Sequence, residues 1–341
     1  MAFLEQLPIR AARAPRRIVL AEGDEERVRD AALRLAEAGG LEPVVLIADA
    51  AIDMPVDWGG EVRRPADDDQ LGQFAEVYRE ALQGKQLTLA AARDEVRDPL
   101  RFAGMMVRTG AADGAVAGAV HATPDVIRAA LRCIGAAPGV STVNGAFYMV
   151  VPAFRGEGEG EGGGRDGGAD RAEVLTFADS GVVPDPSAAQ LAEIAAQAAE
   201  MRGRIVGDEP RVAFLSYSTC GSAAGPSVEK MREALTLFRD AHPDVAADGE
   251  FQVDAALMED VGRRKAPGSA VAGRANVLIF PDLDAGNIAY KLVERLAGAT
   301  AIGPILHGLA RPFNDLSRGA SAADVEWVAY VTALMASDLD S

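Results

Sequence analysis

Residues 17–48 read RIVLAEGDEERVRDAALRLAEAGGLEPVVLIA, which is the pattern of a strand, a helix and a second strand. The β run Arg17–Ala21 precedes Glu25–Ala38, where apolar residues recur at helical spacing and a glycine pair follows. Pro43–Ala48 then reads as a second buried strand. The same alternation continues along the chain to a final predicted helix at Ala322–Ala336. Strands separated by helices predict parallel sheets, so we expect an α/β protein.

Length and charge narrow the class of protein further. The chain has 341 residues, which favours two domains. Its net charge of −17 argues against a nucleic-acid partner, because such partners are bound by neutralising phosphates. No apolar run reaches the roughly 18–20 residues of a membrane span, and the start lacks the pattern of a signal peptide. We therefore expect a cytoplasmic protein that begins with a short surface helix, although four arginines before residue 18 also leave a transit peptide as the alternative.

Metal and dinucleotide sites have little support in the sequence. Two cysteines and three histidines, without metal-ligand spacing, predict no metal site. The segment Gly156–Asp170 is almost wholly Gly, Glu and Asp, so we predict a mobile loop. It contains a GxGxxG pattern at residues 158–163, but its glutamates would repel phosphate and no helix follows. The runs on either side, Val143–Pro152 and Glu173–Ala178, are expected to pair as a hairpin.

Loops at the carboxyl ends of strands are where open α/β sheets place their sites. In the glycine-rich segment Ala112–Thr123, Thr123 opens a predicted helix, and a helix N-terminus attracts anions. The alternative is that Thr123 simply N-caps the helix before a proline at its first position. A second loop, Leu215–Gly225, is rich in hydroxyls but lacks the Gly-Lys-Ser/Thr ending of a phosphate-binding P-loop.

Two cationic side chains, Lys291 and Arg318, are candidates for binding a phosphoryl group. Lys291 lies four residues after Asn287, so both share one face of a predicted helix. Such a lysine is either a solvated surface charge or, beside a cleft, a ligand for a phosphoryl group. Arg318, between Ser317 and Gly319, is positioned to present its guanidinium to a phosphate.

Four separated motifs then resemble one family, the phosphate acetyltransferases of the phosphate acetyl/butyryl transferase family, in the short form. They are LTFADSGVVP (175–184), LSYSTCGS (215–222), ANVLIFPDLDAGN (275–287) and NDLSRG (314–319). The resemblance implies reversible transfer of an acetyl group between acetyl phosphate and coenzyme A, giving acetyl-CoA and phosphate. Coenzyme A is then a substrate, and no cofactor is expected.

The family's fold and assembly follow as further expectations. The resemblance implies two α/β domains with parallel-rich sheets, like isocitrate and isopropylmalate dehydrogenases, with the active-site cleft between them. One domain would be discontinuous, residues 1–141 plus 301–341, and the other would be residues 142–300. The family is usually dimeric, and we expect a homodimer through the middle domain, where Pro186–Arg202 is an Ala-rich helix.

The matching motif implies Ser317, Arg318 and Asp324 as the catalytic residues. Asp324 would take the proton of the thiol of coenzyme A. The sequence also allows a purely structural role, because Ser321 and Asp324 have the spacing of a capping box that opens the last helix.

Thr123, Asn287 and Lys291, together with Arg318, are expected to bind acetyl phosphate. The sequence departs from the family pattern at Ala117, often a serine, and at Ala122, often a threonine. Cys220 replaces a residue that is commonly basic. These departures concern the substrate contacts and leave the segment from Ser317 to Asp324 intact.

Three other functions are compatible with parts of this pattern. A phosphate butyryl or propanoyl transferase shares the general pattern. A non-catalytic domain that senses acetyl-CoA, like the one fused to malic enzymes, would bind without turnover. A dehydrogenase linked to NAD or NADP would need an aspartate cluster for a divalent metal, and the sequence offers no convincing one.

Overall fold

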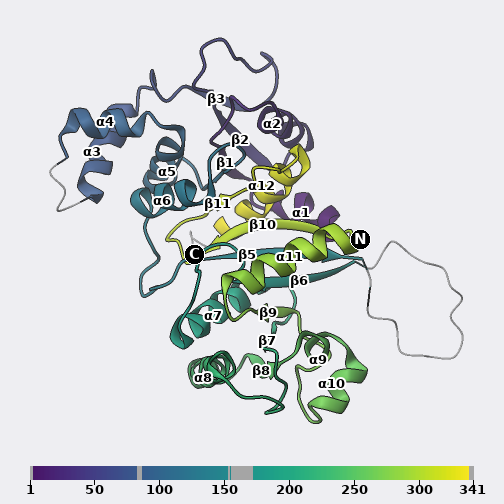
Figure 1. Cartoon of the computed structure of the whole chain (residues 1–341). Helices are drawn as coiled ribbons and strands as arrows, with labels where there is room; N and C mark the ends of the chain where they lie inside the picture. The colour runs from purple at the N-terminus through teal and green to yellow at the C-terminus, as the bar shows by residue number, and fades with distance from the viewer. Residues whose placement is uncertain (1–2, 83–86, 153, 155–171, 338–341) are drawn as a thin grey trace, which may run out of the picture. The chain divides into compact units, whose positions relative to one another are not determined.

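The computed structural model describes residues 3–82, 87–152, 154 and 172–337 (Figure 1). The segment 156–170, predicted to be a mobile loop, lies outside the described residues. The chain forms two compact units. We call Leu4–Gly139 with Gly303–Ser341 the terminal unit, and Val140–Ile302, to which Phe3 also belongs, the middle unit.

The terminal unit is built on a five-stranded parallel sheet, with the order β11-β4-β1-β2-β3. Its strands are β1 (Arg16–Leu20), β2 (Leu41–Leu46), β3 (Glu61–Arg63), β4 (Gly114–Ala117) and β11 (Phe313–Asp315). Because β11 comes from the last part of the chain and pairs with β4, the two chain segments of this unit share one sheet.

Helices cover both faces of this sheet, as successive strand residues point to opposite sides. They are α1 (Phe3–Ala11), α2 (Glu26–Ala38), α3 (Leu71–Ala81), α4 (Leu89–Val96), α5 (Pro99–Thr109), α6 (Thr123–Cys133) and α12 (Ala322–Ala336). Val19 and Ala115 pack in a core with α3 to α6, whereas α2 and α12 lie together on the other side (Figure 1). The last helix, α12, has the bounds that the sequence predicts.

The middle unit has a six-stranded sheet, in the order β10-β5-β6-β9-β7-β8. Its strands are β5 (Asn144–Val151), β6 (Glu173–Ala178), β7 (Arg211–Leu215), β8 (Ala246–Phe251), β9 (Val277–Ile279) and β10 (Thr300–His307), the last of which continues into the terminal unit. Strands β5 and β6 are antiparallel, which confirms the predicted hairpin. The pairs β6–β9, β9–β7 and β7–β8 are parallel, so the predicted α/β fold with parallel-rich sheets is confirmed.

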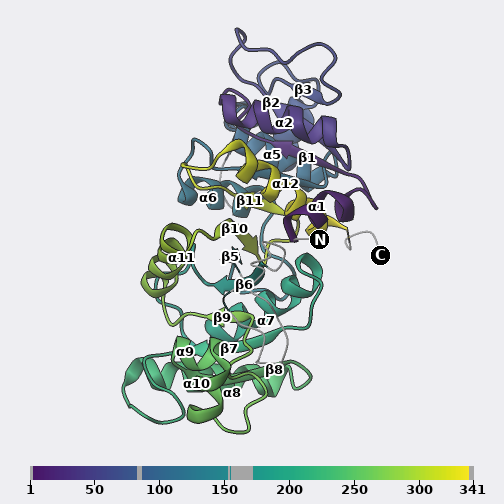
Figure 2. The ribbon, with the colours of Figure 1, turned by 90° about the vertical axis from the view of Figure 1, so that its right-hand side faces the viewer.

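The helices of the middle unit are α7 (Ala188–Ile205), α8 (Pro226–Ala241), α9 (Val253–Leu257), α10 (Glu259–Lys265) and α11 (Leu283–Ala297). Helix α7 packs on α8, β6 and β9, and its apolar side chains are buried there. Helix α11 packs on the opposite face of this sheet (Figure 2). The Ala-rich helix that motivated the expected dimer therefore uses its apolar face within its own unit.

None of the helices in the described parts of the chain has the length and apolar character needed to cross a membrane.

Candidate active site

The loops that follow β1, β4 and β11 meet at one edge of the terminal-unit sheet, and Glu22 ties two of them together. Its buried carboxylate accepts hydrogen bonds from the backbone N–H groups of Ala119 (2.6 Å), Val120 (3.1 Å) and His121 (2.9 Å). The Nδ1 of His121 lies 2.7 Å from the same carboxylate. Burial alone would raise the pKa of Glu22, but these hydrogen bonds outweigh it and keep that pKa below its ordinary value. In return, the hydrogen bond to Glu22 raises the pKa of His121.

Asp315, the last residue of β11, ties the third loop to α6. It is fully buried, and its Oδ2 accepts a hydrogen bond of 2.6 Å from Thr123 Oγ1. Gly118 allows this approach, since its φ is +104° and a Cβ there would overlap the Asp315 carboxyl. Burial raises the pKa of Asp315 to about 7, although the Thr123 hydroxyl and the N–H of Leu316 oppose this shift.

The structure excludes the alternative that Thr123 is the N-cap of α6. Ala122 is the N-cap residue, and Thr123 is the first residue of the helix. The Thr123 side chain makes no capping hydrogen bond, because its hydroxyl is directed to Asp315 instead.

The predicted catalytic residues Ser317 and Arg318 lie on an exposed turn directly after β11. The N–H of Ala320 donates to the carbonyl of Ser317 at 2.8 Å and closes this turn. Arg27, at the start of α2, donates to the carbonyls of Arg318 (3.2 Å), Ala320 and Ala119 (3.2 Å). One guanidinium thus fixes the Ser317–Ala320 turn and the loop after β4 together. The Arg318 guanidinium itself makes no hydrogen bond to any described residue.

Asp324 forms the capping box that the sequence allows. Its Oδ2 accepts hydrogen bonds from the Ser321 N–H (2.7 Å) and hydroxyl (2.8 Å), and its own N–H donates to that hydroxyl at 3.3 Å. Among the described residues, none donates a hydrogen bond to its other oxygen, Oδ1. The cap therefore uses one carboxylate oxygen, and the second is left for other chemistry.

Asn287 and Lys291 lie on α11 and so belong to the middle unit, whereas Thr123, Ser317, Arg318 and Asp324 belong to the terminal unit. Helix α11 begins after Asp282, whose side chain accepts a hydrogen bond of 2.9 Å from the Ala285 N–H. Asn287 is partly buried and Lys291 is exposed, with its Nζ 4.8 Å from the centre of the Tyr290 ring.

The hydroxyl-rich loop after β7 is held in place by a buried glutamate on the neighbouring strand β8. Glu250, buried on β8, accepts hydrogen bonds from Ser218 Oγ (2.6 Å), Arg232 Nε (2.8 Å) and the Gly221 N–H (3.0 Å). Burial would raise the pKa of Glu250, but these donors lower it to about 2. The Ser218 hydroxyl therefore donates its proton to Glu250 and has a structural role in this loop. Cys220, two residues later, is exposed.

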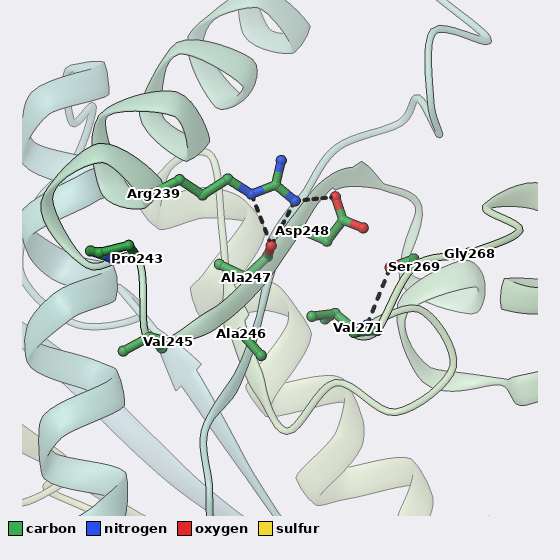
Figure 3. Close-up of a pocket in the computed structure, with 10 residues that line it drawn as sticks. Arg239, Pro243, Val245, Ala246, Ala247, Asp248, Gly268, Ser269 and Val271 are labelled. Atoms are coloured by element: carbon green, nitrogen blue, oxygen red, sulfur yellow. Dashed lines mark hydrogen bonds and ion pairs between the residues drawn. The ribbon is translucent and has the colours of Figure 1, made fainter.

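Each unit has a cavity among its described residues. In the terminal unit, a cavity of about 130 Å³ is lined by Asp98, Leu100, Arg101, His121, Asp125, Arg128 and Ala129. In the middle unit, a cavity of about 440 Å³ lies beside β8. Figure 3 shows that Arg239, one of the residues lining this cavity, reaches Asp248 and the Ala247 carbonyl, so its guanidinium is already paired. Within the described ranges, no group of three or more His, Cys, Asp or Glu residues is arranged to hold a metal ion.

Sequence reasoning missed three residues that organise this edge: Glu22, Arg27 and Asp315. A signal was present for two of them. Glu22 directly follows the predicted strand Arg17–Ala21, and Asp315 lies inside the quoted NDLSRG motif. Arg27 carries no such signal, because it is one of several arginines on an amphipathic helix.

Comparisons with known proteins cover almost the whole chain. Residues 2–333 match the phosphate acetyl/butaryl transferase family. The chain is 44% identical over 342 residues to a phosphate acetyltransferase of Acetivibrio thermocellus, covering 98% of both chains. It is 45% identical over 334 residues to a phosphate acetyltransferase of Paracoccus denitrificans, covering 98% of this chain and 99% of that one.

Solved structures agree with this match. The EutD phosphotransacetylase from Staphylococcus aureus superposes with a TM-score of 0.84 at 36% identity, over 98% of both chains. A 4-hydroxythreonine-4-phosphate dehydrogenase from Klebsiella pneumoniae is similar in fold alone, with a TM-score of 0.51 at 12% identity over 94% of this chain and 99% of that one.

Proposed function

This chain belongs to the phosphate acetyl/butaryl transferase family, and we propose on that premise that it is a phosphate acetyltransferase. It transfers an acetyl group reversibly between acetyl phosphate and coenzyme A, giving acetyl-CoA and phosphate. The observation that carries this conclusion is the match over almost the whole chain to enzymes of that name. Phosphate acetyltransferases among these relatives favour an acetyl over a butyryl or propanoyl group.

The described residues suggest how the terminal unit serves this reaction. The thiol sulfur of coenzyme A attacks the carbonyl carbon of acetyl phosphate, the thiol proton is taken up, and the bond from carbon to the phosphate oxygen breaks. Asp324 Oδ1 is the proposed acceptor of the proton. Full transfer from a thiol to an ordinary aspartate is uphill by about 6 kcal/mol, so the proton moves as the sulfur attacks. Ser317 and Arg318 provide a hydroxyl and a cation for the departing phosphate.

The remaining substrate contacts are also part of this proposal. Thr123, Asn287 and Lys291 would bind acetyl phosphate together with Arg318. The chemistry needs no cofactor, because an acyl phosphate is already activated for attack. We further propose a cytoplasmic homodimer without a nucleic-acid or membrane partner, in keeping with the net charge of −17.

The test compares two variants that affect the same capping box. Asp324→Asn keeps an oxygen that can accept the Ser321 N–H but removes the base, so kcat for acetyl-CoA formation should fall about 10²–10⁴-fold. Ser321→Ala weakens the cap by about 1 kcal/mol but keeps the carboxylate, so its kcat should stay within a few-fold of the parent. Thermal unfolding monitors both folds.

Two results would contradict the proposal at different levels. A wild-type enzyme that forms no thioester from acetyl phosphate and coenzyme A would refute the activity. Near-normal kcat in Asp324→Asn would leave the activity standing and give Asp324 a structural role alone. A panel of acetyl, propanoyl and butyryl phosphates, compared by kcat/KM, tests the acyl group.

A further inference from the structure

Thr123 and Asp315 share one short hydrogen bond, and its direction decides what Thr123 can offer to a ligand. A threonine hydroxyl carries a single proton. If that proton is donated to an ionised Asp315, the hydroxyl can only accept from outside. The oxygens of a phosphoryl dianion are acceptors themselves, so an ionised Asp315 leaves Thr123 without a proton for them. The distance of 2.6 Å between Thr123 Oγ1 and Asp315 Oδ2 fits donation in either direction.

The surroundings of Asp315 disfavour its ionised form. Its side chain is fully buried, and across the described part of the chain no well-aligned donor serves its Oδ1. Gly118 packs directly against this oxygen, where no side chain fits. The Leu316 N–H is the backbone donor nearest this carboxyl, and it offsets only part of the cost of burying the charge. Protonation of Asp315 removes that desolvation cost. The resulting pKa of about 7 makes both forms of Asp315 available near neutral pH.

We propose that Asp315 is a positioning residue that acts through Thr123 when acetyl phosphate binds. In the bound state, Asp315 is neutral and donates its proton to Thr123 Oγ1, while Thr123 turns its own proton to a phosphoryl oxygen. An enzyme whose Asp315 is ionised therefore takes up one proton on binding and releases it when the phosphoryl group leaves. No covalent bond of the substrate changes in this step. The inference rests on the proposed function, since it assumes the contact between Thr123 and acetyl phosphate.

Other groups at this edge also bear on a pH dependence. The charge of Glu22, from the loop after β1, adds to the upward shift in the pKa of Asp315. His121, from the loop after β4, is paired with Glu22, and its pKa is raised by that pairing. Charged groups on neighbouring elements include Arg27 at the start of α2, Asp125 in the first turn of α6 and Asp324 in the first turn of α12. Arg318 follows Asp315 on the exposed turn. Helix α12 meets β11 through the uncharged Thr332 and Met335, which contact Asn314.

The experiment measures KM for acetyl phosphate at saturating coenzyme A from about pH 6 to pH 9, a range in which acetyl phosphate keeps a constant charge. In the wild type, KM should rise as the pH passes through the pKa of Asp315. Asp315→Asn carries an amide N–H that can donate to Thr123 at every pH, so its KM should stay low and nearly flat. His121→Gln is the matched control and should keep the wild-type dependence.

A second pair of variants tests the contact even if Asp315→Asn does not fold. Thr123→Val removes the hydroxyl, so its KM should exceed that of the wild type by about 10- to 100-fold at low pH. This ratio should approach one at high pH, where the wild-type hydroxyl has no proton to donate. Thr123→Ser should reproduce the wild-type trend with pH.

Three outcomes would overturn the inference. They are a wild-type KM that does not change with pH, a pH dependence that persists in Asp315→Asn and vanishes in His121→Gln, and a Thr123→Val ratio that is constant with pH. An unchanged KM in Thr123→Val at low pH would refute the Thr123 contact while acetyl transfer itself stands. A wild type without acetyl transfer would refute the proposed function instead.

Discussion

At the scale of single residues, the buried Asp315 also makes a prediction for stability. An aspartate in the unfolded chain has a pKa near ~3.9, whereas burial raises that of folded Asp315 to about 7. Between these values the folded state holds a proton that the unfolded state has lost, so the contribution of Asp315 to stability falls as the pH rises from ~4 to about 7. Above that range, the remaining cost of the buried charge is constant.

Asp315→Asn removes this titration and keeps a neutral side chain of similar shape. The difference in Tm between variant and wild type should therefore favour the variant more at pH 8 than at pH 5. Thermal unfolding at both values measures it. A difference in Tm that is equal at the two pH values would mean that Asp315 titrates alike in the folded and unfolded chain.

At the scale of elements, Arg27 joins the start of α2 to the Ser317–Ala320 turn and to the loop after β4. Arg27→Gln should release the turn, and a displacement of catalytic groups by about 1 Å can cost 10²-fold in rate. We expect kcat/KM to fall by about 10- to 100-fold, with Tm within a few degrees of the parent.

Arg34→Gln offers a matched control on the same helix. Its side chain is exposed and, among the described residues, forms an ion pair with Glu326 at 3.2 Å, so its loss should leave kcat/KM unchanged. If the two variants behave alike, the hydrogen bonds of Arg27 to the turn are not needed to position it.

Some of these elements could be predicted from the sequence and others could not. Helix α12 was predictable because Ser321 and Asp324 form its cap from residues three apart. Strand β11 was missed, because three residues are too few to show a period and they become a strand only by pairing with β4. For Thr123 the sequence offered a ligand contact or a local cap, yet the hydrogen-bond partner of its hydroxyl, Asp315, lies 192 residues away along the chain. Contacts between loops at a sheet edge depend on the topology, which local patterns do not contain.

At the scale of the whole molecule, the proposed homodimer needs an apolar surface, and α7 does not provide it. Helix α11 presents Ile288, Leu292 and Leu296 at a spacing of four residues, with 58%, 51% and 81% of each exposed. Three large apolar side chains in one stripe are unusual on a free surface and typical of an interface. We therefore expect the two copies to meet through α11.

Leu292→Glu places a charge in the middle of this stripe, where burial against a second copy would be costly. Sedimentation at micromolar concentration should give a dimer for the wild type and a monomer for the variant. Leu237→Glu, on α8 of the same unit, is the control, because Leu237 is an exposed leucine (40%) outside the stripe. It should remain dimeric. A monomeric wild type would contradict the dimer itself, whereas a dimer that survives Leu292→Glu would place the interface on another surface.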